Sequence, residues 1–244
     1  MKRAPPERHA SEFGVIRLRY RARTQTLTYE QRGGNQTTVD HTAVSLDGYV
    51  HALYGLALQH GGARVLMIGC AGGTLATMLT RAGKRVTVVD IDKVSFKLAA
   101  RYFSLPRKVK RHVGEGLAFM AGARRPYDVL VVDAFVGEDI PSNLRGAAFF
   151  DAVRRCVRDD GLALVNVCLA RCSDRRADAI AAAFSARDWA VRLLDGQGHE
   201  RNAIVAAGAV QDLKRPKMIT PPHSGAAQTR SDLESMRFRA VSQA

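Results

Sequence analysis

Long apolar runs and regularly spaced cysteines are both missing from this sequence. A membrane-spanning helix needs about 20 predominantly apolar residues, and no run in the chain reaches that length. The four cysteines are Cys70, Cys156, Cys168 and Cys172. Their spacing fits neither a zinc site nor a CxxC redox pair, so we interpret them as ordinary thiols of a reducing compartment. The sequence therefore predicts no membrane partner and no metal.

A secretory signal and two common nucleotide motifs are also missing. Residues 1–13 carry positive charge but lack the apolar stretch of a signal peptide, so the cytoplasm is the expected location. The main glycine-rich turn, at residues 69–73, matches neither the GxGxxG dinucleotide fingerprint nor a P-loop. NAD and P-loop nucleotides are therefore disfavoured as ligands.

Acidic residues are scarce relative to basic ones, with 23 Asp and Glu against 37 Lys and Arg and a formal net charge of +14. Such a charge favours polyanions, including nucleic acid. Arg17, Arg19, Arg21 and Arg23 alternate and would line one face of a strand. The first interpretation of this stripe is a solvated strand face or a surface that pairs with an acidic neighbour, and the second is a nucleic-acid surface. Tyr20 is its only aromatic residue and no nucleic-acid motif accompanies it, which favours the first interpretation.

The first 44 residues predict an N-terminal arm and a small β domain. We expect residues 1–12 to be disordered, residues 13–20 and 26–30 to form a hairpin because their apolar residues alternate, and a turn at Gly33-Gly34 to lead into a short strand. A helix over residues 46–58 then leads into the main domain, which we place at residues 45–210.

From Arg64 onward the pattern alternates between apolar strands and amphipathic helices. Such alternation is typical of βαβ units and a mostly parallel, Rossmann-like sheet in an α/β fold. The last two strands are separated only by a turn containing Gly196 and Gly198, which predicts an antiparallel edge pair. The expected strands are residues 64–69, 85–90, 109–114, 127–135, 162–169, 189–195 and 202–208, and the expected helices are residues 74–83, 94–103, 147–157, 176–186 and one that starts at Glu115.

Residues 211–244 differ from the rest in composition. The proline-rich, polar segment at residues 213–228 predicts an extended arm. Residues 231–241 are expected to form a terminal helix, with Ser231 as N-cap and Glu234 completing a capping box.

The glycine turn and the acid that ends the next strand predict a ligand. The turn is Gly69-Cys70-Ala71-Gly72-Gly73, and Asp90 closes the strand at residues 85–90. Ligands of such sheets lie outside the carboxyl ends of the strands, and a carboxylate there suits the two hydroxyls of a ribose. The alternative is a tight turn with a surface acid.

Two more acids follow strands at the same end of the sheet. Glu115 could accept a hydrogen bond from an exocyclic amine such as that of adenine, or it could stabilise the N-terminus of its own helix. Asp133 ends a very apolar strand, where a buried carboxylate is costly unless it binds something. It could accept from an amine, act as a general base, or cap a helix or hold a loop.

In order and content these motifs resemble the spermidine synthases (polyamine aminopropyltransferases), over roughly residues 26–208. IGCAGGTL is similar to the glycine turn of that family, VVDID to its second strand, HVGEGLAFM to its adenine-side motif and YDVLVVDAF to its catalytic strand. GGNQTTVD resembles the segment whose glutamine contacts the nucleoside product. The resemblance implies a class I S-adenosylmethionine methyltransferase fold with an N-terminal β domain.

The resemblance also implies roles for residues of this chain. Decarboxylated S-adenosylmethionine or S-adenosylmethionine would be the co-substrate, without a metal, a small-molecule amine would be the acceptor, and the protein would be a homodimer. Asp133 would take a proton from the attacking amine. The implied co-substrate residues are Gln36, Gly69, Cys70, Gly72, Asp90, Ile91, Glu115, Gly116, Asp133 and Ala134, and the implied acceptor residues are Tyr49 and Glu138.

Several acids of the family pattern are replaced. Ala71 stands where the glycine turn usually carries an aspartate, and Val136 and Gly137 stand where a second aspartate and a proline usually follow the catalytic strand. The Tyr-His-Glu segment has a partial counterpart at Tyr49 and His51. Three functions stay open: an aminopropyltransferase, a methyltransferase acting on an anionic or nucleic-acid acceptor, and a non-catalytic nucleoside-binding protein.

Overall fold

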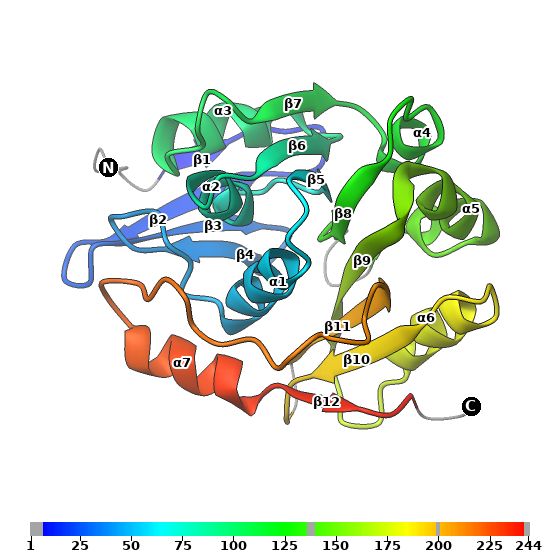
Figure 1. Ribbon diagram of the computed structural model, residues 1–244. Helices are drawn as coiled ribbons and strands as arrows, with labels where there is room; N and C mark the ends of the chain where they lie inside the picture. The colour runs from blue at the N-terminus through cyan, green and yellow to red at the C-terminus, as the bar shows by residue number, and fades with distance from the viewer. Residues whose placement is uncertain (1–6, 136–139, 199–200, 242–244) are drawn as a thin grey trace.

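Two β-sheets and the helices that cover them make up the protein, shown here as a computed structural model (Figure 1). The structure describes residues 7–135, 140–198 and 201–241. The smaller sheet has four antiparallel strands in the order β1-β2-β3-β4, and the larger has eight in the order β12-β10-β11-β9-β8-β5-β6-β7. This architecture confirms the expected α/β fold with a separate N-terminal β-sheet.

The smaller sheet comes from the N-terminal segment and packs against α3 (Lys93–Tyr102). The alternation of apolar and charged residues explains which face of this sheet is buried, because Ile16 and Leu18 face the core while Arg17 and Arg19 are exposed. The prediction that residues 1–12 are disordered is wrong for residues 7–9, which pair with β2 and extend the sheet. Its strands are β1 (Glu7–His9), β2 (Ile16–Arg21), β3 (Thr26–Gln31) and β4 (Gly34–Val39).

The arginine stripe lies only in part on this sheet. Arg17, Arg19 and Arg21 are exposed on β2, whereas Arg23 falls in the turn after it. Arg19 pairs with Glu30 of β3. The stripe thus contains at least one ion pair with an acidic neighbour, as the first interpretation expects.

The larger sheet is parallel from β7 to β9 and antiparallel beyond β9. β10 and β11 pair with each other in antiparallel orientation as expected. The prediction that they form the edge is wrong, because β12 pairs with β10 and is itself the outermost strand. The strands are β5 (Arg64–Ile68), β6 (Arg85–Asp90), β7 (Lys110–Val113), β8 (Tyr127–Val132), β9 (Val157–Leu169), β10 (Val191–Asp195), β11 (Arg201–Gly208) and β12 (Arg237–Arg239).

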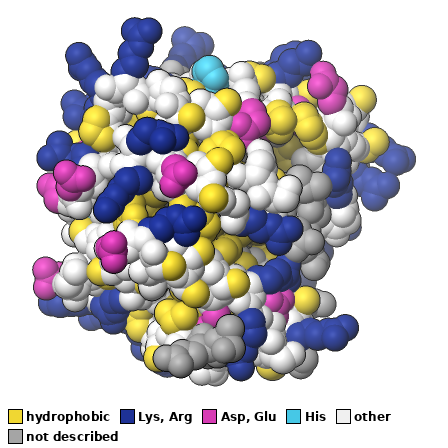
Figure 2. All heavy atoms as spheres, turned by 90° about the vertical axis from the view of Figure 1, so that its right-hand side faces the viewer, with side chains coloured by type: hydrophobic (Ala, Val, Ile, Leu, Met, Phe, Trp, Pro, Cys, Tyr) yellow, Lys and Arg dark blue, Asp and Glu magenta, His cyan; other side chains and the backbone are white. Residues whose placement is uncertain are grey.

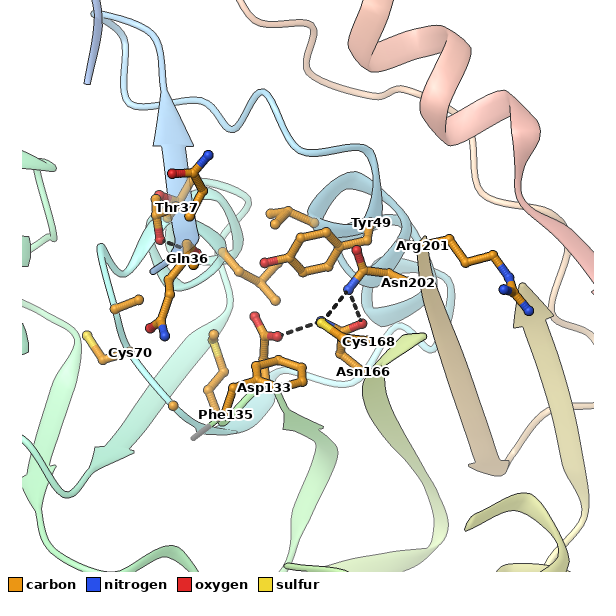
Figure 3. A pocket seen from close by; sticks show the side chains of 18 of the residues that line it. Gln36, Thr37, Tyr49, Cys70, Asp133, Phe135, Asn166, Cys168, Arg201 and Asn202 are labelled. Atoms are coloured by element: carbon orange, nitrogen blue, oxygen red, sulfur yellow. Dashed lines mark hydrogen bonds between the residues drawn. The ribbon is translucent and has the colours of Figure 1, made fainter. Parts of the chain in front are cut away.

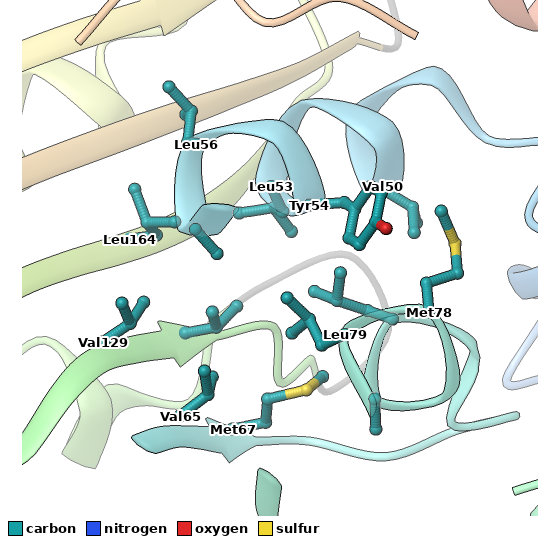
Figure 4. Packing of buried hydrophobic residues seen from close by; sticks show 14 of the residues in the cluster. Val50, Leu53, Tyr54, Leu56, Val65, Met67, Met78, Leu79, Val129 and Leu164 are labelled. Carbon is teal, nitrogen blue, oxygen red and sulfur yellow. The ribbon is translucent and has the colours of Figure 1, made fainter. Parts of the chain in front are cut away.

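Helices cover both faces of the larger sheet. On one face, α1 and α2 pack side chains such as Leu53 and Leu79 against Val65, Val129 and Leu164 of the strands (Figure 4). On the other face, α4, α5 and α6 build a second core. The remaining helices are α1 (Gly48–Gln59), α2 (Thr74–Arg81), α4 (Gly116–Ala121), α5 (Ala147–Cys156), α6 (Arg176–Ser185), α7 (Ala226–Ser235) and a 3₁₀ turn, η1 (Ser142–Leu144).

The C-terminal helix begins and ends earlier than expected. α7 starts after Gly225, which adopts a left-handed conformation with φ of 73°, so Ser231 lies inside the helix and is not its N-cap. The chain then becomes extended because Arg239 of β12 pairs with Asp178 and Asp195. Pairing with β10, a long-range interaction, replaces the last helical turns predicted from local sequence.

No helix in the described part of the chain is long and apolar enough to cross a membrane. On the face shown in Figure 2, Lys and Arg side chains are spread among acidic and apolar ones.

Candidate functional site

Two adjoining cavities lie where the parallel strands end. We name them after one residue of each: the Asp90 cavity, of about 230 Å³, and the Asn166 cavity, of about 210 Å³. They meet at the exits of β5 and β8, because the same six residues line both. These shared residues are Gln36, Gly69, Cys70, Ala71, Asp133 and Phe135.

The glycine turn follows β5 and is shaped by contacts within the protein. Gly69 has φ of +100°, and a Cβ there would lie 2.2 Å from the carbonyl oxygen of Asp133. Gly72 donates its N–H to Oγ1 of Thr37 (3.2 Å), and a Cβ on Gly72 would lie 2.8 Å from Cγ2 of Thr37. At Gly69 only glycine fits, because two backbones approach each other there, whereas at Gly72 the close neighbour is a side chain. Gly72 lines neither cavity, although the resemblance implied that it contacts the co-substrate.

Asp90 fastens the glycine turn to the end of β6. Its Oδ2 accepts the backbone N–H of Cys70 (2.7 Å), and its Oδ1 accepts that of Asp92 (2.7 Å). Burial raises the pKa of Asp90 to about 6, although these backbone donors oppose the shift. Each carboxylate oxygen still has a lone pair for a further donor. Asp90 lines its cavity and can therefore hold the turn and accept from ligand hydroxyls as well.

Glu115 is the N-cap of α4. Its carboxylate accepts the N–H groups of Leu117 (2.9 Å) and Ala118 (2.6 Å), and Nδ2 of Asn143 donates to it as well (2.7 Å). The contacts therefore support the alternative interpretation, in which Glu115 stabilises the N-terminus of its own helix. Glu115 and Gly116 both line the Asp90 cavity, so the start of α4 still forms one wall of that cavity.

Asp133 lies just past β8, at the junction of the two cavities. Figure 3 shows it among the side chains of the Asn166 cavity. Its Oδ1 accepts a hydrogen bond from Nδ2 of Asn166 (2.7 Å). Burial raises the pKa of Asp133 to about 6, and the Asn166 hydrogen bond opposes that rise. A carboxylate with such a pKa is ionised at neutral pH and can still take up a proton, as a general base must.

The other predicted site residues divide between the two cavities. Ile91 and Ala134 line the Asp90 cavity, Tyr49 lines the Asn166 cavity, and Gln36 lines both. Burial raises the pKa of Tyr49 well above its ordinary value, with Asp133 and Asp47 adding to the effect. The acceptor residue Glu138, and the replaced positions Val136 and Gly137, lie outside the described residues.

Sequence reasoning missed the amide side chains of the Asn166 cavity. Asn166 of β9 is buried and contacts Asp133, and Asn202 of β11 contacts Asn166 (3.0 Å). Thr37 and Cys168 line the same cavity. Asn166 could have been noticed as the one amide within the apolar run LALVNVCL, because a buried polar group needs a partner.

Comparison with protein families agrees with this geometry. The family model of the spermine/spermidine synthase domain matches residues 48–169. The chain belongs to the spermine/spermidine synthase family. The matched range contains α1, the glycine turn, Asp90, Glu115, Asp133 and Asn166.

Curated relatives of this family member are transferases. It is 31% identical over 121 residues to a probable polyamine aminopropyl transferase of Bifidobacterium longum, a match that covers 49% of this chain and 27% of that relative. It is 30% identical over 122 residues to an N-terminal histidine N-methyltransferase of Emericella nidulans, covering 48% of this chain and 22% of that relative. The chain thus matches only about a quarter of the length of these two relatives.

The whole fold has a counterpart among solved structures. A probable spermidine synthase from Corynebacterium glutamicum aligns with a TM-score of 0.80 at 18% identity, over 98% of this chain and 92% of that one. At 18% identity this similarity establishes a shared fold, and the alignment covers the N-terminal sheet as well as the domain matched by the family model.

Proposed function

We propose that this family member is a spermidine synthase-like aminopropyltransferase, with decarboxylated S-adenosylmethionine as donor and an amine as acceptor. The observation that carries the proposal is the position of Asp133 between two adjoining cavities. The nucleoside of the donor would occupy the Asp90 cavity, where Asp90 accepts from ribose hydroxyls and the start of α4 lies against the adenine. The acceptor amine would approach Asp133 through the Asn166 cavity.

The reaction would be a direct displacement. An ammonium has no lone pair, so the acceptor must lose a proton before it attacks, and the carboxylate of Asp133 would take that proton. The amine nitrogen then forms a bond to the carbon next to the sulfonium, while the bond from that carbon to sulfur breaks and leaves methylthioadenosine, a neutral thioether. The remaining contribution of the protein is to hold the two substrates in line.

The charges around the Asn166 cavity favour a decarboxylated donor. S-adenosylmethionine carries a carboxylate, which a cation stabilises best. Among the described residues lining this cavity, Arg201 has the single guanidinium, and it donates to Oδ1 of Asp195 (2.9 Å) and to the carbonyl oxygen of Gly198 (3.0 Å). Its side chain extends away from Asp133 (Figure 3). A donor without the carboxylate needs no such partner.

Methyl transfer from S-adenosylmethionine is the second candidate function. The 30% identity to an N-methyltransferase, close to the 31% to an aminopropyl transferase, favours keeping it. The displacement is the same at a different carbon, and Asp133 would play the same role. Under this alternative, the exposed arginines of β2 would suit an anionic or nucleic-acid acceptor. For either function we propose a cytoplasmic homodimer.

Product analysis separates these functions. The protein is incubated with decarboxylated S-adenosylmethionine and a panel of mono- and diamines, and methylthioadenosine is quantified by mass spectrometry. A parallel series uses S-adenosylmethionine and scores S-adenosylhomocysteine. We expect methylthioadenosine from the wild type and none above background from Asp133→Asn. Its absence with every amine would refute the proposal, and tight nucleoside binding without turnover in either series would indicate a non-catalytic protein.

A further inference from the structure

A chain of hydrogen-bonded amides ends on Asp133. Asn202 donates from Nδ2 to Oδ1 of Asn166 (3.0 Å), and Asn166 donates from Nδ2 to Oδ1 of Asp133 (2.7 Å). The three residues come from β11, β9 and the exit of β8, which are neighbouring strands. Asn166 is only 1% exposed, so its amide relies on these two partners. Figure 3 shows the three side chains converging at the cavity.

The donors and acceptors of these hydrogen-bonded side chains can be ordered in only one direction when Asp133 is ionised. A carboxylate is solely an acceptor, so Asn166 must turn its NH₂ group toward Asp133. The Oδ1 atom of Asn166 then faces Asn202, which must present its own NH₂ group. The same Nδ2 of Asn202 also donates to Sγ of Cys168 (3.5 Å), which is consistent with this orientation. Asn202 therefore favours the rotamer of Asn166 that stabilises the charged form of Asp133.

The geometry leaves one oxygen of Asp133 for a ligand. Oδ1 is occupied by Asn166, whereas Oδ2 receives no hydrogen bond from any residue that the structure describes. Rotation of the carboxylate would break the 2.7 Å contact of Oδ1 with Asn166. The amide thus restrains the rotation of the carboxylate and leaves Oδ2 available to a ligand at the junction of the cavities, which Asp133 lines.

We propose that Asn166, held by Asn202, is a positioning residue that keeps Asp133 ionised and aims its Oδ2 at the incoming acceptor amine. The role as a base in transfer rests on the function proposed above. The effect of Asn166 on the charge of Asp133 does not rest on that function, because it follows from the hydrogen bonds alone. A charge-assisted hydrogen bond of this kind is worth about 1.5–3 kcal/mol, or a factor of about 10 to 150 in the proton affinity of the carboxylate.

Other groups near Asp133 act in the opposite direction. Asp47, the N-cap of α1, faces Asp133, and the other acidic or neutral titratable side chains lining the two cavities are Tyr49, Cys70, Cys168, Asp90, Asp92 and Glu115. The two described guanidinium groups that line these cavities already have partners, since Arg32 donates to the carbonyl oxygen of Phe13 and Arg201 donates to Asp195. Asp47 and Asp133 repel one another when both are charged, and burial disfavours the charge on each. In this setting, Asn166 is the described partner that hydrogen-bonds to the charged form of Asp133.

The test measures the protonation of Asp133 directly. Protein labelled with ¹³C at the aspartate carboxyl carbons is titrated by NMR, and the Asp133 signal is identified by its loss in Asp133→Asn. We expect Asn166→Ala and Asn166→Val to move the titration midpoint of Asp133 to higher pH, so that the proton concentration at the midpoint falls at least tenfold. Valine suits the apolar strand β9, which guards against misfolding of the alanine variant. Asn202→Ala should move the midpoint in the same direction by a smaller amount.

The matched control is Asn35→Ala, which makes the same substitution at an exposed residue lining the same cavity. Its midpoint should equal that of the wild type. An unchanged midpoint in both Asn166 variants would overturn the positioning role.

The pH dependence of transfer gives the second readout. The acidic limb of kcat/KM for methylthioadenosine release should move to higher pH in the Asn166 variants, together with the NMR midpoint. If the wild type transfers nothing, the proposed function fails while the titration still decides the positioning role. If transfer occurs and the midpoint stays fixed, the positioning role fails while the proposed function stands.

Discussion

The α-carbon of Gly69 lies against the carbonyl oxygen of Asp133, so closely that a Cβ would be only 2.2 Å from that oxygen. This contact ties the start of the glycine turn to the residue proposed as the base. The backbone N–H of Asp133 also donates to the carbonyl oxygen of Ile68 (2.9 Å), just before the turn. The spacing of the two cavities at their junction therefore depends on a backbone contact between β5 and β8.

Gly69→Ala should disrupt this junction. The left-handed φ would cost about 1–2 kcal/mol, and the overlap with the Asp133 carbonyl would add about 1–3 kcal/mol. Gly83→Ala is a matched control, because Gly83 also has a positive φ (+86°) but a Cβ added there would meet nothing within 4 Å. Denaturant unfolding measures both variants. Equal losses of stability would show that the contact with Asp133 carries no extra cost.

Asp90→Asn should weaken nucleoside binding by about 10- to 100-fold, because a neutral amide forms weaker hydrogen bonds to ribose hydroxyls than a carboxylate does. Calorimetry with methylthioadenosine measures the affinity. Asp128→Asn serves as the control, since Oδ2 of Asp128 also accepts a backbone N–H, that of Arg64 (2.8 Å), but Asp128 lines neither cavity. Unchanged affinity in Asp90→Asn would refute the ribose role.

Ala71→Asp should improve the use of diamines. Ala71 adopts a left-handed conformation with φ of 43°, which aspartate and asparagine tolerate better than alanine does. An added carboxylate at the junction of the cavities would give a second ammonium a partner worth about 1.5–3 kcal/mol, so KM for putrescine should fall about tenfold or more.

Ala71→Asn separates charge from backbone preference. It should share any gain in stability with Ala71→Asp but leave the KM for putrescine near the wild-type value. The same fall in KM in both variants would show that the negative charge is not the cause.

Asp133→Asn should stabilise the protein at neutral pH. The folded pKa of about 6 lies above the ordinary value of 3.8, so the folded state binds the proton more tightly than the unfolded chain does. The wild type therefore loses stability as pH rises from about 4 to about 6, by about 2–3 kcal/mol from this group. Asparagine does not titrate in this range, so the gain in stability of the variant should appear above pH 6 and vanish below pH 4. Thermal unfolding across this range measures it, and a gain that is constant with pH would contradict the assignment.

Much of the fold could be predicted because its signals are local. The switch from alternating residues in the first 40 positions to strand–helix repeats after Arg64 follows from burial of one face of each element. The same rule placed Asp90 and Asp133 at the carboxyl ends of parallel strands. The end of the chain was mispredicted because pairing of β12 with β10 and the ion pairs of Arg239 override the helical preference of residues 236–241.

The candidate site divides in the same way. The sequence by itself determined the order of the chemical groups, with a glycine turn after one strand and acids after the next ones, because each group is read from the few residues around it. Only the tertiary structure decided that Asn202, Asn166 and Asp133 form one hydrogen-bonded chain and that Gly69 must accommodate the Asp133 carbonyl. The contacting pairs are 36 (Asn202 and Asn166), 33 (Asn166 and Asp133) and 64 (Asp133 and Gly69) positions apart in the sequence, and the register of the sheet brings them into contact.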